Sequence, residues 1–438
     1  MSLFAQAHLN PGVRKREVFG WAMYDFANSG YTTVVLTAVF AAYFVGGVAG
    51  NAEWSTFAWT LALSVSSLIV MLTVPVIGTW ADQHASKKPV LLLTTVGCVL
   101  ATAALAWVGP GDVALALVLV VLSNTCFAWG ESIIAAFLPE LAKADSMGKV
   151  SGWGWSFGYL GGMLSLGLCL AYVLKAQAND VPAAEFVPVT MLITAAVFAL
   201  AAGVTFALLR EHAKPSLRQD ARKTGLRASF AQLLETFRRA RSYPDFMWLL
   251  ACTVAYQGGV AVTIALAAIY AEQVIGFEKL ETMVLIFVLN IAAALGAFAF
   301  GYWQDRIGHK LALGSTLVGW VATCIIAALT TTKGGFWWAA AIAGVCMGAS
   351  QSSGRAMAGM FAPPKQLAEF YGLWTFAVRL ASIIGPLSYG LITWATGGNH
   401  RIAIASTAVL FAAGLLILLP VQMERGRARA LASDPLQL

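Results

Sequence analysis

The sequence predicts an all-α polytopic membrane protein, with twelve transmembrane helices in two pseudo-symmetric halves of six. Of its 438 residues, 59% are hydrophobic and only 11% are charged, which is too apolar for a soluble globular protein. The apolar residues gather in twelve stretches, each long enough to cross a hydrocarbon core about 30 Å thick. Two short loop patterns also recur between the first and second halves of the chain, which indicates an internal repeat.

The twelve stretches divide at the longest polar interval, residues 210–243. This division predicts an N-terminal six-helix bundle over residues 1–209, a basic cytoplasmic linker over 210–243, a C-terminal six-helix bundle over 244–421 and a cytoplasmic tail over 422–438. The predicted spans, in chain order, are 18–46, 54–80, 89–108, 113–138, 149–174, 186–209, 245–271, 282–303, 311–330, 335–361, 369–394 and 401–420.

The basic residues predict how the helices are oriented. Most of them lie beside span ends on one side, including nine in the linker, and only Lys175, Lys279, Lys333 and Arg401 lie on the other. Because cytoplasmic loops are enriched in Lys and Arg, both termini are expected in the cytoplasm and the protein in the cell (inner) membrane. This distribution accounts for the net charge of +7, so the lipid bilayer, and not nucleic acid, is the expected partner. We expect a monomer.

Apolar residues within the linker recur at helical spacing. They predict an amphipathic helix on the inner leaflet. A solvated linker with incidental periodicity is the alternative. The residues concerned are Phe230, Leu233, Leu234 and Phe237.

The cysteines and histidines exclude several kinds of site. All six cysteines lie inside apolar stretches without CxxC spacing, and all five histidines lie at span ends or in loops. The cysteines are therefore expected to be small core residues. We expect no disulfide, no metal, no cofactor and no catalytic residue, and the chain is not predicted to be an enzyme.

An acidic residue interrupts the first apolar stretch. Residues 21–31 read WAMYDFANSGY, and Tyr24, Asp25 and Asn28 fall on the same half of a helix. Asp25 lies nine residues beyond Arg16, roughly 13 Å along a helix axis, and so near the middle of the membrane. Ionisable residues at that depth usually face the bundle interior and serve transport. The structural alternative is a buried hydrogen-bonding residue.

Two loop patterns carry the internal repeat. GTWAD at 78–82 recurs as GYWQD at 301–305, an offset of 223, and FLP at 137–139 recurs as FAP at 361–363, an offset of 224. Two nearly equal offsets predict that corresponding helices occupy corresponding places. Repeats of this kind are typical of transporters that work by alternating access around a central site.

The repeat makes two opposite charges equivalent. Glu131 lies eight residues before Pro139, and Arg355 lies eight residues before Pro363. One half therefore has an acid in its fourth helix where the other half has a base in its tenth. The sequence predicts that Glu131 and Arg355 approach one another across the centre of the bundle in at least one conformation.

A fourth charge lies at a similar depth. Arg379 is ten residues past Glu369, about 15 Å into the eleventh helix. Asp25 and Glu131 in the first half and Arg355 and Arg379 in the second thus form a nominally neutral set.

This set suits a substrate that carries both signs, such as a zwitterionic amino acid. An arginine would bind its carboxylate, while an acid or an aromatic face would bind its ammonium. Burial raises the pKa of a carboxylate, whereas a nearby guanidinium lowers it. A carboxylate that moves between two such settings can take up and release a proton, so Glu131 is the first candidate for proton coupling and Asp25 the second. The alternative is that Glu131–Arg355 and Asp25–Arg379 are ion pairs that only stabilise the bundle. The expected substrate-binding residues are Tyr24, Asp25, Asn28, Glu131, Gln351, Arg355 and Arg379.

Both copies of the first loop pattern resemble the signature of the major facilitator superfamily, Gly-x-Leu-Ala-Asp-Arg-x-Gly-Arg-Lys. The resemblance implies a gate on the cytoplasmic side, closed by the motif Asp together with basic residues and a neighbouring helix end. In the first copy Gln83, Ala85 and Ser86 depart from the signature, which implies a weaker latch there. The matching residues are Gly78, Asp82 and Lys87 in the first copy and Gly301, Asp305, Arg306, Gly308 and Lys310 in the second.

Three further stretches, residues 21–40, 137–162 and 370–390, resemble the vacuole-effluxer-like family, whose fungal members are associated with export of amino acids such as leucine. The resemblance implies a secondary active transporter that exports or exchanges small neutral amino acids. Two alternatives stay open: a proton-coupled exporter of varied amphipathic compounds, and, more remotely, a membrane receptor or scaffold that transports nothing.

Overall fold

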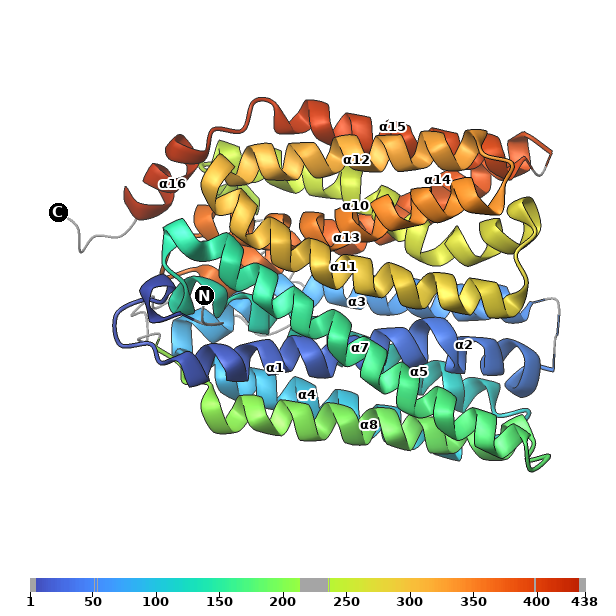
Figure 1. The fold of residues 1–438 in the computed structure, drawn as a ribbon. Helices are drawn as coiled ribbons and strands as arrows, with labels where there is room; N and C mark the ends of the chain where they lie inside the picture. The colour runs from blue at the N-terminus through green and yellow to red at the C-terminus, as the bar shows by residue number, and fades with distance from the viewer. Residues whose placement is uncertain are drawn as a thin grey trace.

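The computed structural model is a bundle of long helices that run side by side along one axis (Figure 1). Apart from an isolated bridge between Leu9 and Ala142, the described residues contain no β-structure. The all-α prediction is therefore confirmed. The structure describes residues 5–50, 52, 54–212, 235, 237–397 and 399–432.

Every predicted span corresponds to a helical segment. The first is α1, which continues through a π-helical segment (Thr32–Ala38), the single turn α2 (Phe40–Tyr43) and a second π-helical segment (Phe44–Val48). The helices of the first half are α1 (Lys15–Tyr31), α3 (Ser55–His84), α4 (Lys87–Ala104), α5 (Val113–Ala135), the short α6 (Leu138–Leu141), α7 (Met147–Gln177) and α8 (Ala183–Leu208). Those of the second half are α10 (Pro244–Tyr270), α11 (Lys279–Ile307), α12 (His309–Leu329), α13 (Lys333–Phe361), α14 (Leu367–Ala395) and α15 (His400–Leu418).

Eleven of the described segments are long and apolar enough to cross a membrane by length and composition alone. The remaining predicted span, the tenth in chain order, is α13, which has full length but carries several polar residues. The polar side chains that lower its hydropathy include Ser350, Gln351, Ser352, Ser353 and Arg355. Four of these five are buried, so α13 keeps its polar face inside the bundle.

Both chain ends lie at one end of the bundle (Figure 1), which we call the terminal end; the other is the opposite end. Exposed tryptophans lie near both ends and mark the two interfaces of an integral membrane protein. They are Trp80, Trp248 and Trp303 near the terminal end and Trp54, Trp107 and Trp338 near the opposite end.

The most extensive contacts between the halves are those of α3 with α14 and of α7 with α11. Glycine makes these contacts close. A Cβ on Gly78 would overlap the carbonyl of Ala368, and a Cβ on Gly152 would overlap the carbonyl of Ala297. Small residues let helix backbones approach in this way.

The structure describes one of the four apolar residues of the amphipathic helix predicted in the linker. Phe230, Leu233 and Leu234 of the predicted amphipathic helix lie outside the described residues. Phe237 packs edge-on against Phe376 of α14, with ring centroids 5.1 Å apart.

The predicted tail contains a helix that sequence patterns did not predict, α16 (Met423–Ala432). Arg425 in α16 forms a bidentate ion pair with Asp245 at the start of α10, at 2.7 and 2.8 Å. Residues beyond 432 lie outside the described part.

Candidate functional site

The four mid-bundle charges form two ion pairs, and each pair joins the two halves. Nη1 of Arg355 (α13) lies 2.6 Å from Oδ2 of Asp25 (α1). Nη2 of Arg379 (α14) lies 2.9 Å from Oε2 of Glu131 (α5). The partners therefore differ from those in the structural alternative, which paired Glu131 with Arg355 and Asp25 with Arg379. That Glu131 and Arg355 approach one another in another conformation stays a prediction. The repeat predicts the depth of these charges, but which way each side chain turns depends on the neighbouring helices.

Arg355 is enclosed on every side. Its Nε donates to Oγ of Ser151 at 3.2 Å and its Nη2 to the carbonyl of Ser151 at 2.8 Å. Trp21 and Trp155 lie over the guanidinium, with ring centroids 4.7 and 5.2 Å from Cζ. Only 4% of its side chain is exposed, against 10% for Asp25. We call Asp25 and Arg355 the closed pair.

A glycine of α7 faces the closed pair. A Cβ on Gly154 would lie 2.5 Å from Nη2 of Arg355 and 2.6 Å from the Trp21 ring, and would also overlap Oδ2 of Asp25. The closed pair therefore depends on the absence of a side chain at this position.

The Glu131–Arg379 pair is more accessible. The side chain of Glu131 is 35% exposed and that of Arg379 is 14% exposed. Leu115, Val118 and Leu122 form the exposed face of α5, and Glu131, nine residues after Leu122, lies about 180° from that face. Its exposed surface therefore faces the interior of the bundle. We call Glu131 and Arg379 the open pair.

Arg379 keeps an unused donor. Its Nε is buried and has no hydrogen-bond partner among the described residues. The Phe127 ring lies beneath the guanidinium, with its centroid 5.9 Å from Cζ. A buried donor without an acceptor costs free energy, so an acceptor that reaches Nε would be held there.

Two expected site residues occupy the neighbourhood of these pairs. Asn28, one turn of α1 beyond Asp25, is buried, and its Oδ1 has no partner among the described residues. Gln351 of α13 accepts a hydrogen bond at 2.6 Å from Gln257 of α10.

Tyr24 does not face the charges. Its side chain is buried within the first half, where its hydroxyl forms a 2.9 Å hydrogen bond with Thr95 of α4 and its ring contacts Phe198 of α8. In this conformation its hydroxyl is occupied by Thr95, and its place in a substrate site stays a prediction. Tyr24 shares half of the helix with Asp25, but it lies on the side that packs against α8, from which its hydroxyl reaches Thr95 of α4.

Sequence reasoning missed several neighbours of Arg355. The residues concerned are Ser151, Trp21 and Trp155. A tryptophan within a few residues of a span end is more often an interfacial anchor, so the sequence position of Trp155 carries no signal that its ring covers a buried guanidinium. The spacing of Gly154 and Gly158, four residues apart, was the signal that α7 packs closely on another helix.

At the terminal end, an acid of each half caps a helix of the other. Oδ2 of Asp82, near the end of α3, accepts a hydrogen bond at 2.9 Å from the backbone N–H of Glu369 in the first turn of α14. We call this contact the Asp82 latch. A carboxylate is favoured at a helix N-terminus because the unpaired N–H groups there carry partial positive charge.

The second motif copy makes the corresponding contact. Asp305, near the end of α11, accepts hydrogen bonds from the backbone N–H groups of Gly148 and Lys149 at 3.0 and 3.1 Å, in the first turn of α7. Lys149 Nζ lies 3.7 Å from the same carboxylate. We call this contact the Asp305 latch.

Other motif residues have local roles. Gly308 ends α11 with φ of +94°, and the equivalent Ala85 ends α3 with φ of +47°. Lys310 donates to the carbonyl of Leu419 at 2.6 Å. Arg306 is exposed.

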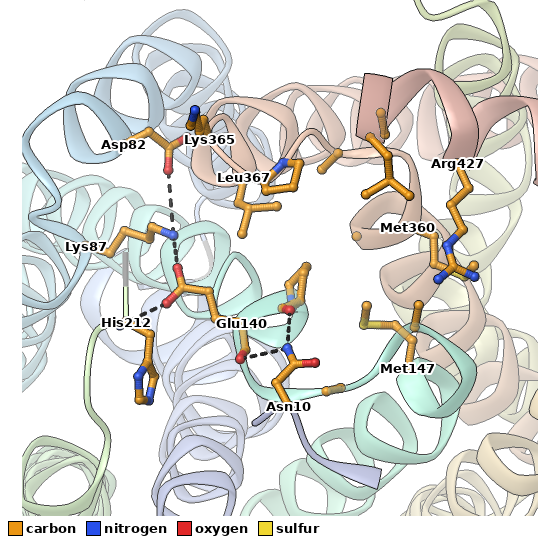
Figure 2. Close-up of a pocket in the computed structure, with 18 residues that line it drawn as sticks. Asn10, Asp82, Lys87, Glu140, Met147, His212, Met360, Lys365, Leu367 and Arg427 are labelled. Atoms are coloured by element: carbon orange, nitrogen blue, oxygen red, sulfur yellow. Dashed lines mark hydrogen bonds and ion pairs between the residues drawn. The ribbon is translucent and has the colours of Figure 1, made fainter. Parts of the chain in front are cut away.

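A chain of charges connects the Asp82 latch to the start of the linker (Figure 2). Lys87 lies 3.7 Å from Asp82 and forms an ion pair with Glu140. Glu140 accepts a hydrogen bond from the backbone N–H of His212 at 3.2 Å, and the His212 ring lies 2.7 Å from Glu17 of α1. The start of the linker is thus fastened to the first half.

These residues line a cavity of about 460 Å³ between the halves at the terminal end (Figure 2). Asn10, which lies in the segment before α1, bonds to the carbonyls of Pro139 and Glu140. His8 lies in the same segment. Burial of its ring lowers its pKa most, and the positive charge of Lys149 lowers it further. The charged lining residues are Asp82, Lys87, Glu140, His212, Lys365 and Arg427.

The described residues contain no group of three or more His, Cys, Asp or Glu side chains that could hold a metal ion. What the site offers chemically is two acids and two guanidinium groups in the bundle interior.

The hydrogen bonds of both ion pairs and both latches lie at mid-bundle or on the terminal side of it, so this structure is closed toward the terminal end.

Comparison with known proteins assigns this chain to a family. Residues 43–431 match the family model described as vacuole effluxer Atg22 like. The uncharacterized MFS-type transporter YxiO of Bacillus subtilis is 27% identical over 410 residues, which cover 92% of this chain and 94% of that protein. Autophagy-related protein 22-1 of Aspergillus fumigatus is 27% identical over 221 residues, which cover 47% of this chain and 36% of that protein.

Solved structures share the fold. The human organic anion transporter MFSD10 superposes with a TM-score of 0.70 at 15% identity, over 92% of this chain and 99% of that one. The transporter FucP in its outward conformation superposes with a TM-score of 0.70 at 16% identity, over 92% and 97%.

Proposed function

The chain belongs to the vacuole effluxer Atg22-like family of MFS-type secondary transporters, and from that premise we propose that it exports or exchanges small neutral amino acids across the cell membrane. Family and fold indicate a transporter and not an enzyme. The fungal autophagy-related relatives match between 44% and 65% of this chain and between 36% and 51% of their own length.

The observation that carries the proposal is the set of four charges at mid-bundle. Two carboxylates from the first half meet two guanidinium groups from the second. A zwitterion presents the complementary groups, a carboxylate and an ammonium, so it can replace one residue in a pair without leaving the other charge unpaired. Replacement matters because a desolvated charge that loses its partner is strongly destabilising.

Alternating access is the expected mechanism. In this proposal the terminal end, with its excess of Lys and Arg, is the cytoplasmic end. The Asp82 and Asp305 latches hold that end closed while substrate exchanges at the opposite end. Because both pairs join the halves, opening the terminal end requires Asp25 and Glu131 to part from their arginines.

That parting gives a route to proton coupling. A carboxylate that loses a guanidinium neighbour in a desolvated setting binds a proton more readily. Glu131 is the first candidate because it is the more exposed acid, and a proton can reach it. Asp25 is the second.

The test is counterflow of leucine and alanine in proteoliposomes. Variants Glu131→Gln, Arg355→Lys and Arg379→Ala remove a charge or the planar guanidinium. Glu185→Gln and Arg241→Ala are matched controls, since both residues are exposed and lie away from the pairs. Flux in the parent and the controls but not in the three variants supports the proposal. A well-folded parent that moves no amino acid but extrudes amphipathic dyes favours the alternative exporter.

A further inference from the structure

The closed and open pairs differ in exposure and in unused hydrogen-bonding capacity, and these differences indicate different functions. We infer that a zwitterionic substrate exchanges partners with the open pair, Glu131 and Arg379, and that the closed pair, Asp25 and Arg355, is a lock between the halves that substrate does not touch. This inference rests on the proposed function and divides its four charges into two pairs.

The closed pair has no room for a ligand. Three donor atoms of the Arg355 guanidinium are occupied, by Asp25 and by Ser151 twice. Trp21 and Trp155 lie over it. A carboxylate could bind there only after Asp25 had moved, which would separate α1 from α13.

Its contacts also join three helices from both halves. Arg355 belongs to α13, and its partners belong to α1 and α7. Next to it, the Ser151 hydroxyl donates to the carbonyl of Ser352 at 2.8 Å, another bond between the halves. Breaking the closed pair therefore loosens the interface on the terminal side of the site.

The open pair has unused capacity instead. Glu131 is about a third exposed, and the buried Nε of Arg379 has no partner among the described residues. A carboxylate that binds the Nε edge of Arg379 gains a charge-assisted hydrogen bond. It also releases Glu131, whose carboxylate is then free to bind an ammonium.

A second unpaired atom lies on the same side of the bundle. Tyr31 stacks on Phe127, the ring beneath Arg379. Asn28 lies on α1 between Asp25 and Tyr31, and its buried Oδ1 has no partner among the described residues. Oδ1 is an acceptor and suits an ammonium. Asn28 is thus assigned to the open pair's subsite and not to the lock.

The first arm of the test measures binding to purified protein by thermal stabilisation with leucine. Two analogues of leucine each lack one of its charged groups: leucinamide lacks the carboxylate and 4-methylpentanoate lacks the ammonium. Leucine should stabilise the parent and each analogue should do so only weakly. Glu131→Gln and Arg379→Lys should bind leucine about tenfold to a hundredfold more weakly, the loss expected from one hydrogen bond to a charged group. Asp25→Asn should weaken leucine binding clearly less than either of these variants, because substrate does not touch the lock.

The second arm needs no ligand. A cysteine at Ser352, which is fully buried behind the closed pair, reports opening through its rate of reaction with a maleimide. Asp25→Asn and Gly154→Ala should raise that rate about tenfold or more, as expected from removing a buried charge pair or overfilling a packed site. Gly167→Ala, on the same helix with nothing within 4 Å, is the control. Glu131→Gln should raise the rate much less than Asp25→Asn does, because the open pair is more exposed and makes no contact with Ser151 or Ser352.

The outcomes separate the two proposals. Equal maleimide rates in Asp25→Asn and Glu131→Gln overturn the division into lock and binding pair, whatever the substrate is. A folded parent that shows the expected maleimide rates but is not stabilised by any neutral amino acid overturns the proposed function, and with it the substrate role of Glu131 and Arg379, while the lock stands.

Discussion

The Asp82 carboxylate on α3 caps the first turn of α14 through the backbone N–H of Glu369, 2.9 Å away. Asp305 caps α7 in the same way from the other half. The two latches are thus the same contact made twice, each time from one half to the other. They explain why the motif carries Asp at this place, since a carboxylate accepts hydrogen bonds and balances the helix dipole at once.

The glycine of the motif is the most direct test of the Asp82 latch. In Gly78→Ala, the new Cβ overlaps the carbonyl of Ala368, so α3 and α14 must separate. Overpacking costs about 1–3 kcal/mol, which lowers the population closed at the terminal end about 5- to 150-fold. The maleimide rate of a cysteine at Ser352 measures it. Gly203→Ala, which meets nothing within 4 Å, should leave the rate as in the parent; the same rise in both variants would count against a latch.

Opposite substitutions at the ends of α3 and α11 should change the stability of the protein in opposite directions. Ala85 has φ of +47° and Gly308 has φ of +94°. A left-handed conformation costs a residue with a Cβ about 1–2 kcal/mol, partly offset by the entropy that glycine loses on folding. Ala85→Gly should therefore stabilise the protein by about 0.5–1 kcal/mol, and Gly308→Ala should destabilise it by at least as much. Thermal unfolding in detergent measures both, and shifts of the same sign would contradict the argument.

The sequence predicted the helices of the fold well because each span is long, apolar and bounded by charges. It also found all four mid-bundle charges, since an ionisable residue inside an apolar stretch stands out. It did not predict how they pair. Pairing depends on which way each helix is turned, and here Ser151 and Trp155 of α7 hold Arg355 against Asp25.

Two other differences have physical causes. Tyr24 lies close to Asp25 in helical projection, yet it bonds to Thr95 of α4 because α8, and not the central interface, packs on that side of α1. The helix α16 was missed because it is short and polar. A long-range ion pair to Asp245, which no local pattern shows, holds it in place.

The orientation is testable by site-specific labelling. His84 and Asn179 are exposed and lie at the terminal and opposite ends, at the close of α3 and just after α7. Single cysteines at His84 or Gln219, the latter outside the described residues, should react with a membrane-impermeant maleimide only from the cytoplasm. One at Asn179 should react only from outside. Labelling of Asn179→Cys from the cytoplasm alone would overturn the orientation.

The two latches should act independently, because they join different helix pairs. Asp82→Asn and Asp305→Asn each keep an acceptor but lose the charge, which is expected to cost about 1–2 kcal/mol per latch, about a 5- to 30-fold loss of the closed population. Contacts without shared partners add, so the double variant should lose about 2–4 kcal/mol. Spin labels at His84→Cys, at the end of α3, and at Arg241→Cys, three residues before α10, report the closed population through their distance distribution; both positions are exposed. Asp112→Asn is the matched control, since that carboxylate accepts a backbone N–H from Gly109 within one half at 2.9 Å. A double variant no more open than the worse single variant would mean that one latch alone holds the terminal end closed.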